Sequence, residues 1–463
     1  MRIAMVASEV HPFSKTGGLG DVVGALPGAL ESLGADVLTI SPLHQCVRRH
    51  KPKRTDVRLR VPLGTGVIDT PVWRKGNAWF LEHDPFFDRE GLYTGPWGDH
   101  GDNAARFTFL ARGAMELLRA VGLPDVLHAH DWQAGLVPVY ARTLYAGDFG
   151  RVKTVFSIHN LAYQGNFRAV DLPMTGLDWS LYNWKQLEFY GKLSFMKAGL
   201  VFADLLTTVS PTYAREIQTP EHGYGLDGVL RDRAGSLRGI LNGADYAEWD
   251  PRSDRHLAER YSPEDLKGKA ACKADLQRSC GFDPRPDVPV IALVSRLAEQ
   301  KGVELVLGGL ERVLGEDVQV ALLGNGEGRF EEAFKGWAAR RPDRFSARIA
   351  FDNAVAHRLE AGADLFLMPS RYEPCGLNQL YSLRYGTVPV VRATGGLADT
   401  VRDGATGFSF GPSTVDAMLD ALRRALGVYR DPDEWRRIQA AGMSEDFGWP
   451  ASAREYLRLY AAR

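Results

Sequence analysis

The sequence has little of what marks secreted, disulfide-stabilised or membrane-bound proteins. Only four of its 463 residues are cysteines, and no two of them form a C-x-x-C pair. Cysteines this sparse cannot build a disulfide framework, and they favour a reducing compartment. The first apolar run, residues 3–7, is too short for the core of a signal peptide. No run approaches the roughly 18 apolar residues that a membrane span needs. We therefore expect a cytoplasmic protein with no membrane partner.

Strong charge of either sign is also absent. A formal net charge of -1 at pH 7 gives no sign of a nucleic-acid partner, because nucleic-acid-binding domains are usually basic. The hydrophobic share of 45% and the charged share of 24% are those of an ordinary globular protein. A chain of this length has room for about three domains of about 150 residues each. These properties favour a globular enzyme.

The two common phosphate-binding glycine motifs are missing as well. The stretch KTGGLG at 15–20 lacks the G-x-G-x-x-G spacing of dinucleotide sites, and its lysine precedes the glycines, unlike a Walker A loop. An NAD-dependent dehydrogenase is therefore excluded. The stretch still offers an accessible backbone, an ammonium group and a helix N-terminus expected near Asp21, which are the ingredients of an anion site. A glycine turn with a solvated lysine is the alternative.

Two series of short apolar runs alternate with helical patterns along the chain. The first series begins at "RIAMVASE" and the second at "VPVIALVSRLAEQKG". Such alternation predicts parallel sheets covered by helices. We expect an α/β protein with two Rossmann-like, doubly wound domains that face each other across a cleft. The expected segments are an N-terminal domain at 1–243, a linker with surface helices at 244–286, a C-terminal domain at 287–435, and a last helix at 436–463 that packs on the N-terminal domain.

The second domain carries most of the residues suited to bind a diphosphate. Arg296 and Lys301 share one loop after a predicted strand, where a guanidinium and an ammonium could neutralise two phosphates. Glu373 is expected at the mouth of a helix that begins near Pro374, with the amides of 375–377 directed at a ligand. The glycine pair after Thr394 opens another helix. Each of these residues alone could equally be a surface charge or a helix-terminal group.

Polar residues follow two predicted strands of the first domain. We expect Asp131 and His159 to contact a sugar, because ligands bind beyond the carboxyl ends of parallel strands. His128 and His130 have the spacing of zinc ligands, but the further ligands of a zinc site are missing, so a metal is the less favoured interpretation. The D-P-D stretch at 431–433 is better explained as a helix start, with its first aspartate as the N-cap, than as a metal chelate.

Several motifs, in order from residue 15 to residue 401, closely resemble those of the bacterial glycogen synthases and plant starch synthases. They are KTGGLGDVVGALP, HAHDW, SIHNLAYQG, LNGAD, SRLAEQKG, PSRYEPCGLNQLYSLRYGTVPVV and TGGLADTV. The resemblance covers essentially the whole chain. It implies a GT-B glycosyltransferase that moves glucose from ADP-glucose to the non-reducing end of an α-1,4-glucan with retention of configuration. The implied partners are a nucleotide-sugar donor and a glucan acceptor, with no cofactor and no metal.

The resemblance also implies roles for individual residues. The candidates for catalysis are Glu373, His159, Lys301, Arg296 and Lys15. Those for donor binding are Gly17, Gly18, Asn242, Cys375, Gly376, Leu377 and Thr394. Asp131 and Tyr93 are placed toward the glucose or the acceptor.

Two positions depart from related patterns. Gln133 stands where related sequences often carry histidine, which leaves the contacts to the acceptor open. The broader retaining GT-B pattern has a second glutamate where this chain has Tyr381, as glycogen and starch synthases do. The loops do not reveal the base of the donor, so a UDP-glucose-using synthase stays an alternative. A nucleotide-sugar epimerase of the same fold and a catalytically silent carbohydrate-binding protein are more distant ones.

Overall fold

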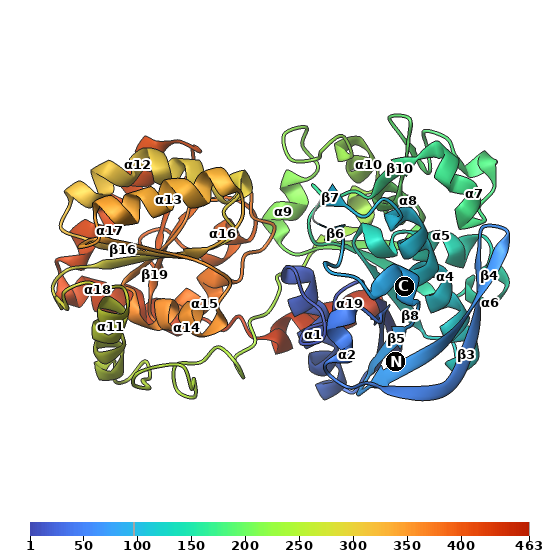
Figure 1. Ribbon diagram of the computed structural model, residues 1–463, viewed down its shortest axis with the longest axis horizontal. Helices are drawn as coiled ribbons and strands as arrows, with labels where there is room; N and C mark the ends of the chain where they lie inside the picture. Colours follow the sequence, from blue (N-terminus) through green and yellow to red (C-terminus); the bar gives the residue numbers. More distant parts are fainter. Residues whose placement is uncertain (96–97, 463) are drawn as a thin grey trace. The chain divides into compact units, whose positions relative to one another are not determined.

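The computed structural model describes residues 1–95 and 98–462, which form two compact units (Figure 1). One unit comprises Met1–Gly243 and Trp449–Arg463, and the other comprises Ala244–Gly448. Each unit is built on its own largely or wholly parallel sheet with helices packed against it. This arrangement confirms the predicted fold class of two Rossmann-like α/β domains.

The sheet of the first unit has nine strands in the order β14-β13-β9-β8-β1-β2-β5-β4-β3. The strands from β14 to β5 run parallel, and β4 and β3 add an antiparallel edge. Their bounds are β1 Arg2–Val6, β2 Asp36–Pro42, β3 Lys53–Leu63, β4 Gly66–Lys75, β5 Ala78–Leu81, β8 Val126–His130, β9 Lys153–Ile158, β13 Leu205–Thr208 and β14 Leu237–Gly239. The apolar runs of the first half thus became the parallel strands, as expected.

Helices cover this sheet, and the last one comes from the end of the chain. Helix α19 (Trp449–Ala461) packs against α1 (Gly18–Ser32), and its Tyr456 joins a core with Ile3 and Leu26. The other helices are α2 Gln45–Arg48, α3 Asp84–Phe87, α4 Asn103–Val121, α5 Leu136–Arg142, α6 Ala146–Phe149, α7 Leu172–Thr175, α8 Phe195–Phe202, α9 Pro211–Glu216 and α10 Asp227–Asp232. Short strands form two small further sheets: β6 Thr94–Gly95 with β7 Gly98–Asp99, and β10 Asn166–Arg168, β12 Lys192–Ser194 and β11 Glu188–Phe189.

The sheet of the second unit is parallel throughout, in the order β17-β16-β15-β18-β19-β20. Its strands are β15 Val290–Val294, β16 Gln319–Gly324, β17 Phe345–Ile349, β18 Leu365–Met368, β19 Val388–Arg392 and β20 Phe408–Phe410. Side chains alternate between the two faces, so Ile291 and Leu293 enter one core while Val290 and Ala292 enter the other. Burial on both faces explains the continuous apolar runs of these strands.

The helices of the second unit lie on both faces of its sheet, with α12 and α13 on one side and α11 and α14 on the other (Figure 1). Their bounds are α11 Lys267–Ser279, α12 Val303–Gly315, α13 Gly328–Arg340, α14 Asn353–Gly362, α15 Asn378–Arg384, α16 Gly395–Thr400, α17 Val415–Tyr429 and α18 Pro432–Met443. The predicted helix start at 431–433 is confirmed, because the Asp431 carboxylate accepts from the N–H groups of Asp433 and Glu434, both at 3.2 Å.

Two segments differ from the expected division of the chain. The segment 244–286 belongs to the second unit, where α11 packs against α14. The expected last helix at 436–463 is two helices, of which α18 lies in the second unit and α19 in the first. Among the described residues, no helix has the length and apolar character that crossing a membrane requires.

Candidate functional site

A buried carboxylate holds the opening glycine-rich loop from inside. Glu9, which is 2% exposed, accepts hydrogen bonds from the N–H of Thr16 at 2.6 Å, the hydroxyl of Thr16 at 2.7 Å and the N–H of Gly17 at 3.3 Å. The hydroxyl of Tyr93 donates to the same carboxylate at 2.5 Å. The N–H groups of Thr16 and Gly17 are therefore already used, and a ligand would have to bind the groups that follow them.

Helix α1 begins at Gly18, earlier than the start expected near Asp21, because extended Gly17 takes the N-cap position. The N–H groups of Gly18 and Leu19 have no hydrogen-bond partner among the described residues. A Cβ atom placed on Gly17 or Gly18 would meet nothing within 4 Å. Unpaired donors beside open space at the start of a long helix are suited to an anion.

Lys15 lies next to this helix start and is paired there. Its Nζ atom is 2.6 Å from Oδ1 of Asp21, and both side chains keep part of their surface exposed, 36% and 22% respectively. An exposed pair of this kind is weak, since water screens it. A phosphate could therefore compete with Asp21 for the ammonium group.

Tyr93 is tied to the base of the same loop. Its hydroxyl lies 2.6 Å from Oγ of Ser8 in addition to its bond to Glu9. Burial, together with the nearby carboxylate, raises its pKa well above the usual value, so the phenol stays protonated. The structure thus places Tyr93 beside the opening loop, where its hydroxyl braces Glu9.

Asp131 and His159, expected at neighbouring strand ends, lie together. Asp131 directly follows β8 with φ of 55°, a left-handed conformation rare outside glycine. Its Oδ1 accepts from the backbone N–H of His159 at 2.7 Å. Burial raises the pKa of Asp131 to about 7, against the lowering effect of the N–H groups of His159 and Asn160. One carboxyl oxygen of Asp131 is therefore spent on positioning the loop after β9.

His159 forms part of a group of three buried imidazoles with His128 and His130. Burial lowers the pKa of His159 to about 3, so its ring is neutral at physiological pH. Its Nε2 lies 3.0 Å from Nδ1 of His130. Within 1–95 and 98–462, no three or more histidine, cysteine, aspartate or glutamate side chains are placed to hold a metal ion. The less favoured zinc interpretation of His128 and His130 thus finds no further ligands there.

Three buried polar atoms at this end of the first sheet make no hydrogen bond to any described residue. They are Oδ1 of Asn242, Oε1 of Gln133 and Nε2 of His130. Buried polar groups are normally paired, so unpaired ones mark places where a ligand hydroxyl or water belongs. Asn242 was a candidate from the resemblance, whereas Gln133 stood out only as a departure from related sequences.

In the second unit, Lys301 and Glu373 form a buried ion pair. The Nζ atom of Lys301 lies 2.5 Å from Oε2 of Glu373, and their side chains are 19% and 6% exposed. The hydroxyl of Ser370 donates to the same oxygen at 3.0 Å. These two residues, far apart in the sequence, therefore meet at the carboxyl ends of β15 and β18, as expected.

The loop that carries Arg296 is tied to the loop that carries Glu373. Arg296 donates to Oε1 of Gln300 at 3.1 Å. The carbonyl of Gln300 in turn accepts from the N–H of Arg371 at 2.8 Å, and its side chain donates to the carbonyl of Tyr372 at 3.4 Å. Arg296 and Lys301 thus belong to one connected pair of loops.

Helix α15 begins at Asn378, so the expected start near Pro374 is wrong. The reason is a turn at Gly376, whose φ of 74° is left-handed and interrupts the helical path. The N–H groups of Gly376 and Leu377 have no hydrogen-bond partner in the described part of the chain. The side chain of Gln379 donates to the carbonyl oxygens of Cys375 and Gly376 at 3.0 and 3.1 Å and holds the turn.

The second glycine loop opens helix α16 as expected, with Thr394 at the N-cap. Its two glycines allow the loop to pack closely against the backbone of residues 373–375. A Cβ atom on Gly395 would lie 1.9 Å from the carbonyl oxygen of Glu373, and one on Gly396 would lie 2.1 Å from that of Cys375. The N–H of Gly396 donates to the carbonyl oxygen of Glu373 at 3.2 Å. This loop therefore presses directly on the backbone that presents Glu373.

Two aromatic residues of the second unit differ sharply in exposure. Tyr381 is buried and stacks on Trp249 at 4.0 Å between ring centroids. Phe351 is 83% exposed, between the end of β17 and the N-cap of α14. Sequence reasoning missed Phe351, because an isolated phenylalanine after a strand carries no motif.

The aromatic stretch at 178–195 is partly exposed. Trp179, Trp184 and Tyr190 are 53%, 73% and 81% exposed. Only part of the stretch, including Leu187 and Phe195, is fully buried. The short sheet of β10, β11 and β12 has too little surface to cover all of these rings.

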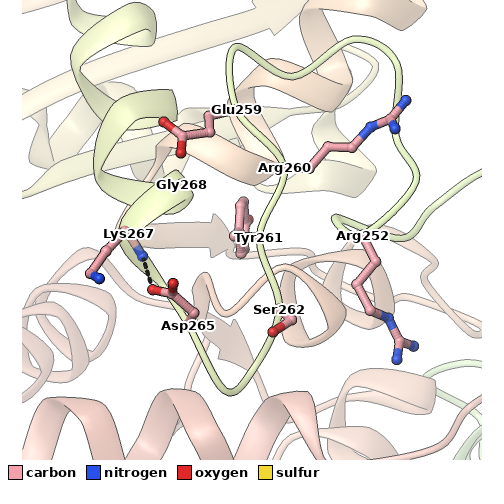
Figure 2. A pocket seen from close by; sticks show the side chains of 8 residues that line it. All are labelled: Arg252, Glu259, Arg260, Tyr261, Ser262, Asp265, Lys267 and Gly268. Carbon is pink, nitrogen blue, oxygen red and sulfur yellow. Dashed lines mark hydrogen bonds between the residues drawn. The ribbon is translucent and has the colours of Figure 1, made fainter.

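A pocket of about 340 Å³ opens elsewhere on the second unit (Figure 2). Arg252, Arg260 and Lys267 line it together with Glu259 and Asp265, so its charges largely balance. Asp265 accepts from the backbone N–H of Lys267 at 3.1 Å. None of the candidate residues lines this pocket, which is therefore separate from them.

Comparisons with known proteins agree with this arrangement. Residues 2–232 match a family described as starch synthase catalytic domain, and residues 282–440 match glycosyl transferases group 1. The chain is 54% identical to a glycogen synthase of Anaeromyxobacter dehalogenans over 99% of this chain and 98% of the relative. It is 46% identical to a glycogen synthase of Koribacter versatilis with the same coverage.

Solved structures give the same result. The catalytic domain of starch synthase IV from Arabidopsis thaliana, bound to ADP and acarbose, superimposes with a TM-score of 0.92 at 32% identity, over 99% of this chain and 98% of that one. A sucrose-phosphate synthase from Thermosynechococcus elongatus matches with a TM-score of 0.62 at 19% identity, over 99% of this chain and 98% of that one. The second likeness concerns the fold alone.

Proposed function

The chain belongs to the family of glycogen and starch synthases, and from this premise we propose that it elongates an α-1,4-glucan with glucose from ADP-glucose, at the non-reducing end and with retention of configuration. The related starch synthase that binds ADP and acarbose supports this donor. We further propose that the protein works in the cytoplasm, which its few scattered cysteines favour.

The buried pair of Lys301 and Glu373 is the observation that carries the proposal. A nucleotide diphosphate leaves as an anion, so its departure needs positive charge more than a proton. The ammonium of Lys301, the guanidinium of Arg296 and the unpaired N–H groups of Gly376 and Leu377 offer such charge from one set of loops. Donors fixed in advance typically change rates by about 100-fold to 1000-fold each when removed.

Glu373 acts as an organiser in this scheme. Its Oε2 atom already accepts from Lys301 and Ser370, so this oxygen is used to hold the two loops together. We propose that Glu373 orients the hydroxyls of the transferred glucose while its charge steadies an oxocarbenium-like transition state. The acceptor hydroxyl would then attack from the face that the leaving group occupies and pass its proton to a phosphate oxygen of the departing diphosphate, which retains the configuration.

The first unit is proposed to contribute the other contacts. Lys15 with the N–H groups after Gly17 and Gly18 would bind phosphate oxygens. The unpaired Oδ1 of Asn242 would accept from a glucose hydroxyl, and the ring of His159 would face the sugar. Asp131 and Tyr93 shape this end of the sheet, and we keep them as candidates toward glucose or acceptor.

Further residues of the second unit complete the proposed donor site. Cys375, Gly376 and Leu377 would meet the glucose and the distal phosphate, with Thr394 nearby. The ring of Phe351 is proposed to stack on the base, because an exposed aromatic face at a strand end suits a purine. We propose that the two lysines and Arg296 supply the charge that a metal ion supplies in other transferases, so that no metal and no cofactor is required.

One assay tests the function. Radiolabelled ADP-glucose and UDP-glucose are each supplied with a glucan primer, and the polymer is then digested with an α-1,4-specific hydrolase. We expect label in the polymer from ADP-glucose and its complete release by the hydrolase. Faster transfer from UDP-glucose would overturn the donor assignment. Label that resists the hydrolase would overturn the linkage and the retention.

The same assay separates the remaining alternatives. A nucleotide-sugar epimerase would convert or hydrolyse the donor without lengthening the primer. A carbohydrate-binding protein without activity would bind primer and consume no donor. The lysine, arginine and glutamate set argues against the second alternative, because simple sugar binding needs no such cluster of charges.

A further inference from the structure

The three buried imidazoles of the first unit are arranged by the register of two strands. His128 and His130 lie two residues apart on β8, so their side chains share one face of the sheet. His130 is paired with Ser157 in the β8–β9 register, and His159 follows two residues later on the same side. The rings of His128 and His130 lie 4.0 Å apart, and Nδ1 of His130 lies 3.0 Å from Nε2 of His159.

Each of these rings carries one proton. Burial lowers the pKa of His128 and of His159 to about 3 and that of His130 well below the usual value. A neutral imidazole has one N–H donor and one acceptor nitrogen, and its hydrogen bonds decide which is which. Only one of the two nitrogens facing each other between His130 and His159 can therefore be the donor.

The free nitrogen of His130 decides the direction of this bond. Its Nε2 atom is buried and has no partner among the described residues. If Nε2 carried the proton, a buried N–H would be left without an acceptor, which is rarer in folded proteins than an acceptor without a donor. The proton is thus better placed on Nδ1, where it meets Nε2 of His159.

We propose that His130 is a positioning residue that donates its Nδ1–H to Nε2 of His159 and thereby fixes His159 with its own proton on Nδ1. His159 then offers an N–H donor, directed away from His130, to an oxygen of a bound sugar. This role toward the sugar rests on the proposed function. The protonation state itself is a property of the protein without ligand.

The surroundings hold both rings in place for this bond. His128, whose ring lies tilted against that of His130, is hydrogen-bonded on both sides, to the hydroxyl of Tyr460 at 2.7 Å and to Oγ of Ser157 at 2.7 Å. The backbone N–H of His159 is held by Asp131 at 2.7 Å. His159 is therefore fixed at its main chain and at one ring nitrogen, which leaves Nδ1 as the group to face a ligand.

Nitrogen NMR of the histidine rings tests the proposal directly. The full-length protein is labelled with ring-¹⁵N histidine, and the two-bond proton–nitrogen correlations are recorded near pH 8 without ligand. The signals of His159 are assigned by their loss in His159→Gln. We expect the pattern of an imidazole protonated at Nδ1. A pattern of protonation at Nε2, or a charged ring, would overturn the proposal.

Two substitutions of His130 sharpen this test. His130→Asn can place its amide N–H near the former Nδ1 position, whereas His130→Leu offers no donor. The Asn variant should keep His159 protonated at Nδ1, and the Leu variant should shift it to Nε2. Glucose transfer should fall by about 10-fold to 100-fold in kcat in the Leu variant and recover largely in the Asn variant. An unchanged His159 pattern in the Leu variant would refute the inference.

His44 gives a matched control. It is also a buried neutral histidine of the first unit, 1% exposed, and its Nε2 lies 3.1 Å from the carbonyl oxygen of Ser8. His44→Leu should leave the protonation of His159 unchanged. If the proton of His159 moved to Nε2 in this variant as well, the effect of His130→Leu would reflect a general loss of packing, and the proposal would be refuted. A wild-type protein with the expected pattern but no transfer from either donor would refute the proposed function alone. Active protein with the opposite pattern would refute this inference alone.

Discussion

Removing the ammonium of Lys301 should damage stability and catalysis through separable causes. In Lys301→Ala the carboxylate of Glu373, only 6% exposed, loses its cation. Breaking a buried pair from one side typically costs about 3–5 kcal/mol, because the remaining charge is left uncompensated. The 19% exposure of Lys301 places this pair near the lower end, at about 3 kcal/mol. For a unit of this size we expect the Tm to fall by about 6–12 °C.

The double variant Lys301→Ala/Glu373→Gln separates the two effects. With the carboxylate neutralised, no charge is stranded, so most of the lost stability should return. Activity should stay at least about 100-fold below that of the wild type, because the positive charge near the leaving diphosphate is still missing and the charge of Glu373 beside the glucose is lost as well. Stability and catalysis should therefore move apart between the single and the double variant.

Calorimetry and incorporation of labelled glucose into a glucan primer check these expectations. Arg312→Ala is the matched control, since its pair with Asp416 at 2.7 Å lies in the same unit with side chains 49% and 78% exposed. It should change stability by less than about 1 kcal/mol and leave activity unchanged. If the double variant recovered activity along with stability, or if Lys301→Ala behaved like the control, the assignment of Lys301 would be refuted.

Three further predictions follow from single residues. Gly396→Ala should lower both stability and activity, because its Cβ would lie 2.1 Å from the carbonyl oxygen of Cys375. Gly336→Ala is the control, since a Cβ there would meet nothing within 4 Å. It should lower neither the Tm nor the rate of glucose transfer when both variants are measured side by side. Phe351→Ala should raise the KM for ADP-glucose several-fold at unchanged Tm and nearly unchanged kcat; an unchanged KM would exclude stacking on the base. The pKa of Asp131 is raised to about 7, so between about pH 4 and 7 the folded protein holds a proton that the unfolded chain releases, and stability falls as the pH rises. The stability of Asp131→Asn relative to the wild type should therefore rise as the pH is raised from 5 to 8. A difference in Tm that stays constant over this range would contradict the prediction.

The parallel strands were predictable because each is a short apolar run between turn signals. The runs that became β1, β15 and β18 are buried on both faces, so their sequence is apolar at nearly every position. The antiparallel edge formed by β3, β4 and β5 was missed. Its outer strands carry many charged residues, such as Arg58 and Arg60, and half of their positions face solvent. Such strands resemble polar loops when the sequence is considered alone.

The helix starts were placed less well than the strands, for a specific reason. Proline favours the first turn of a helix, so a start near Pro374 was the natural prediction, but the left-handed turn at Gly376 delays α15 to Asn378. Glycine is common both in left-handed turns and at helix starts, and the sequence does not show which of the two a given glycine adopts. Glu9 was missed for another reason. It lies outside the glycine stretch, and only the folded loop shows that its carboxylate takes up two of the N–H groups there.

The two lysines proposed to bind phosphate differ in their surroundings, although each lies in a loop next to a helix start. Each is paired with a carboxylate, Lys15 with Asp21 at 2.6 Å and Lys301 with Glu373 at 2.5 Å. The first pair is partly exposed and screened by water, so it adds little to stability and yields easily to a phosphate. The second is largely buried and also organises Glu373. Lys15→Ala should therefore weaken donor binding at nearly unchanged Tm, whereas Lys301→Ala should weaken donor binding and also lower the Tm. A large loss of Tm in Lys15→Ala would show that the exposed pair contributes substantially to stability, and would contradict this distinction between the two lysines.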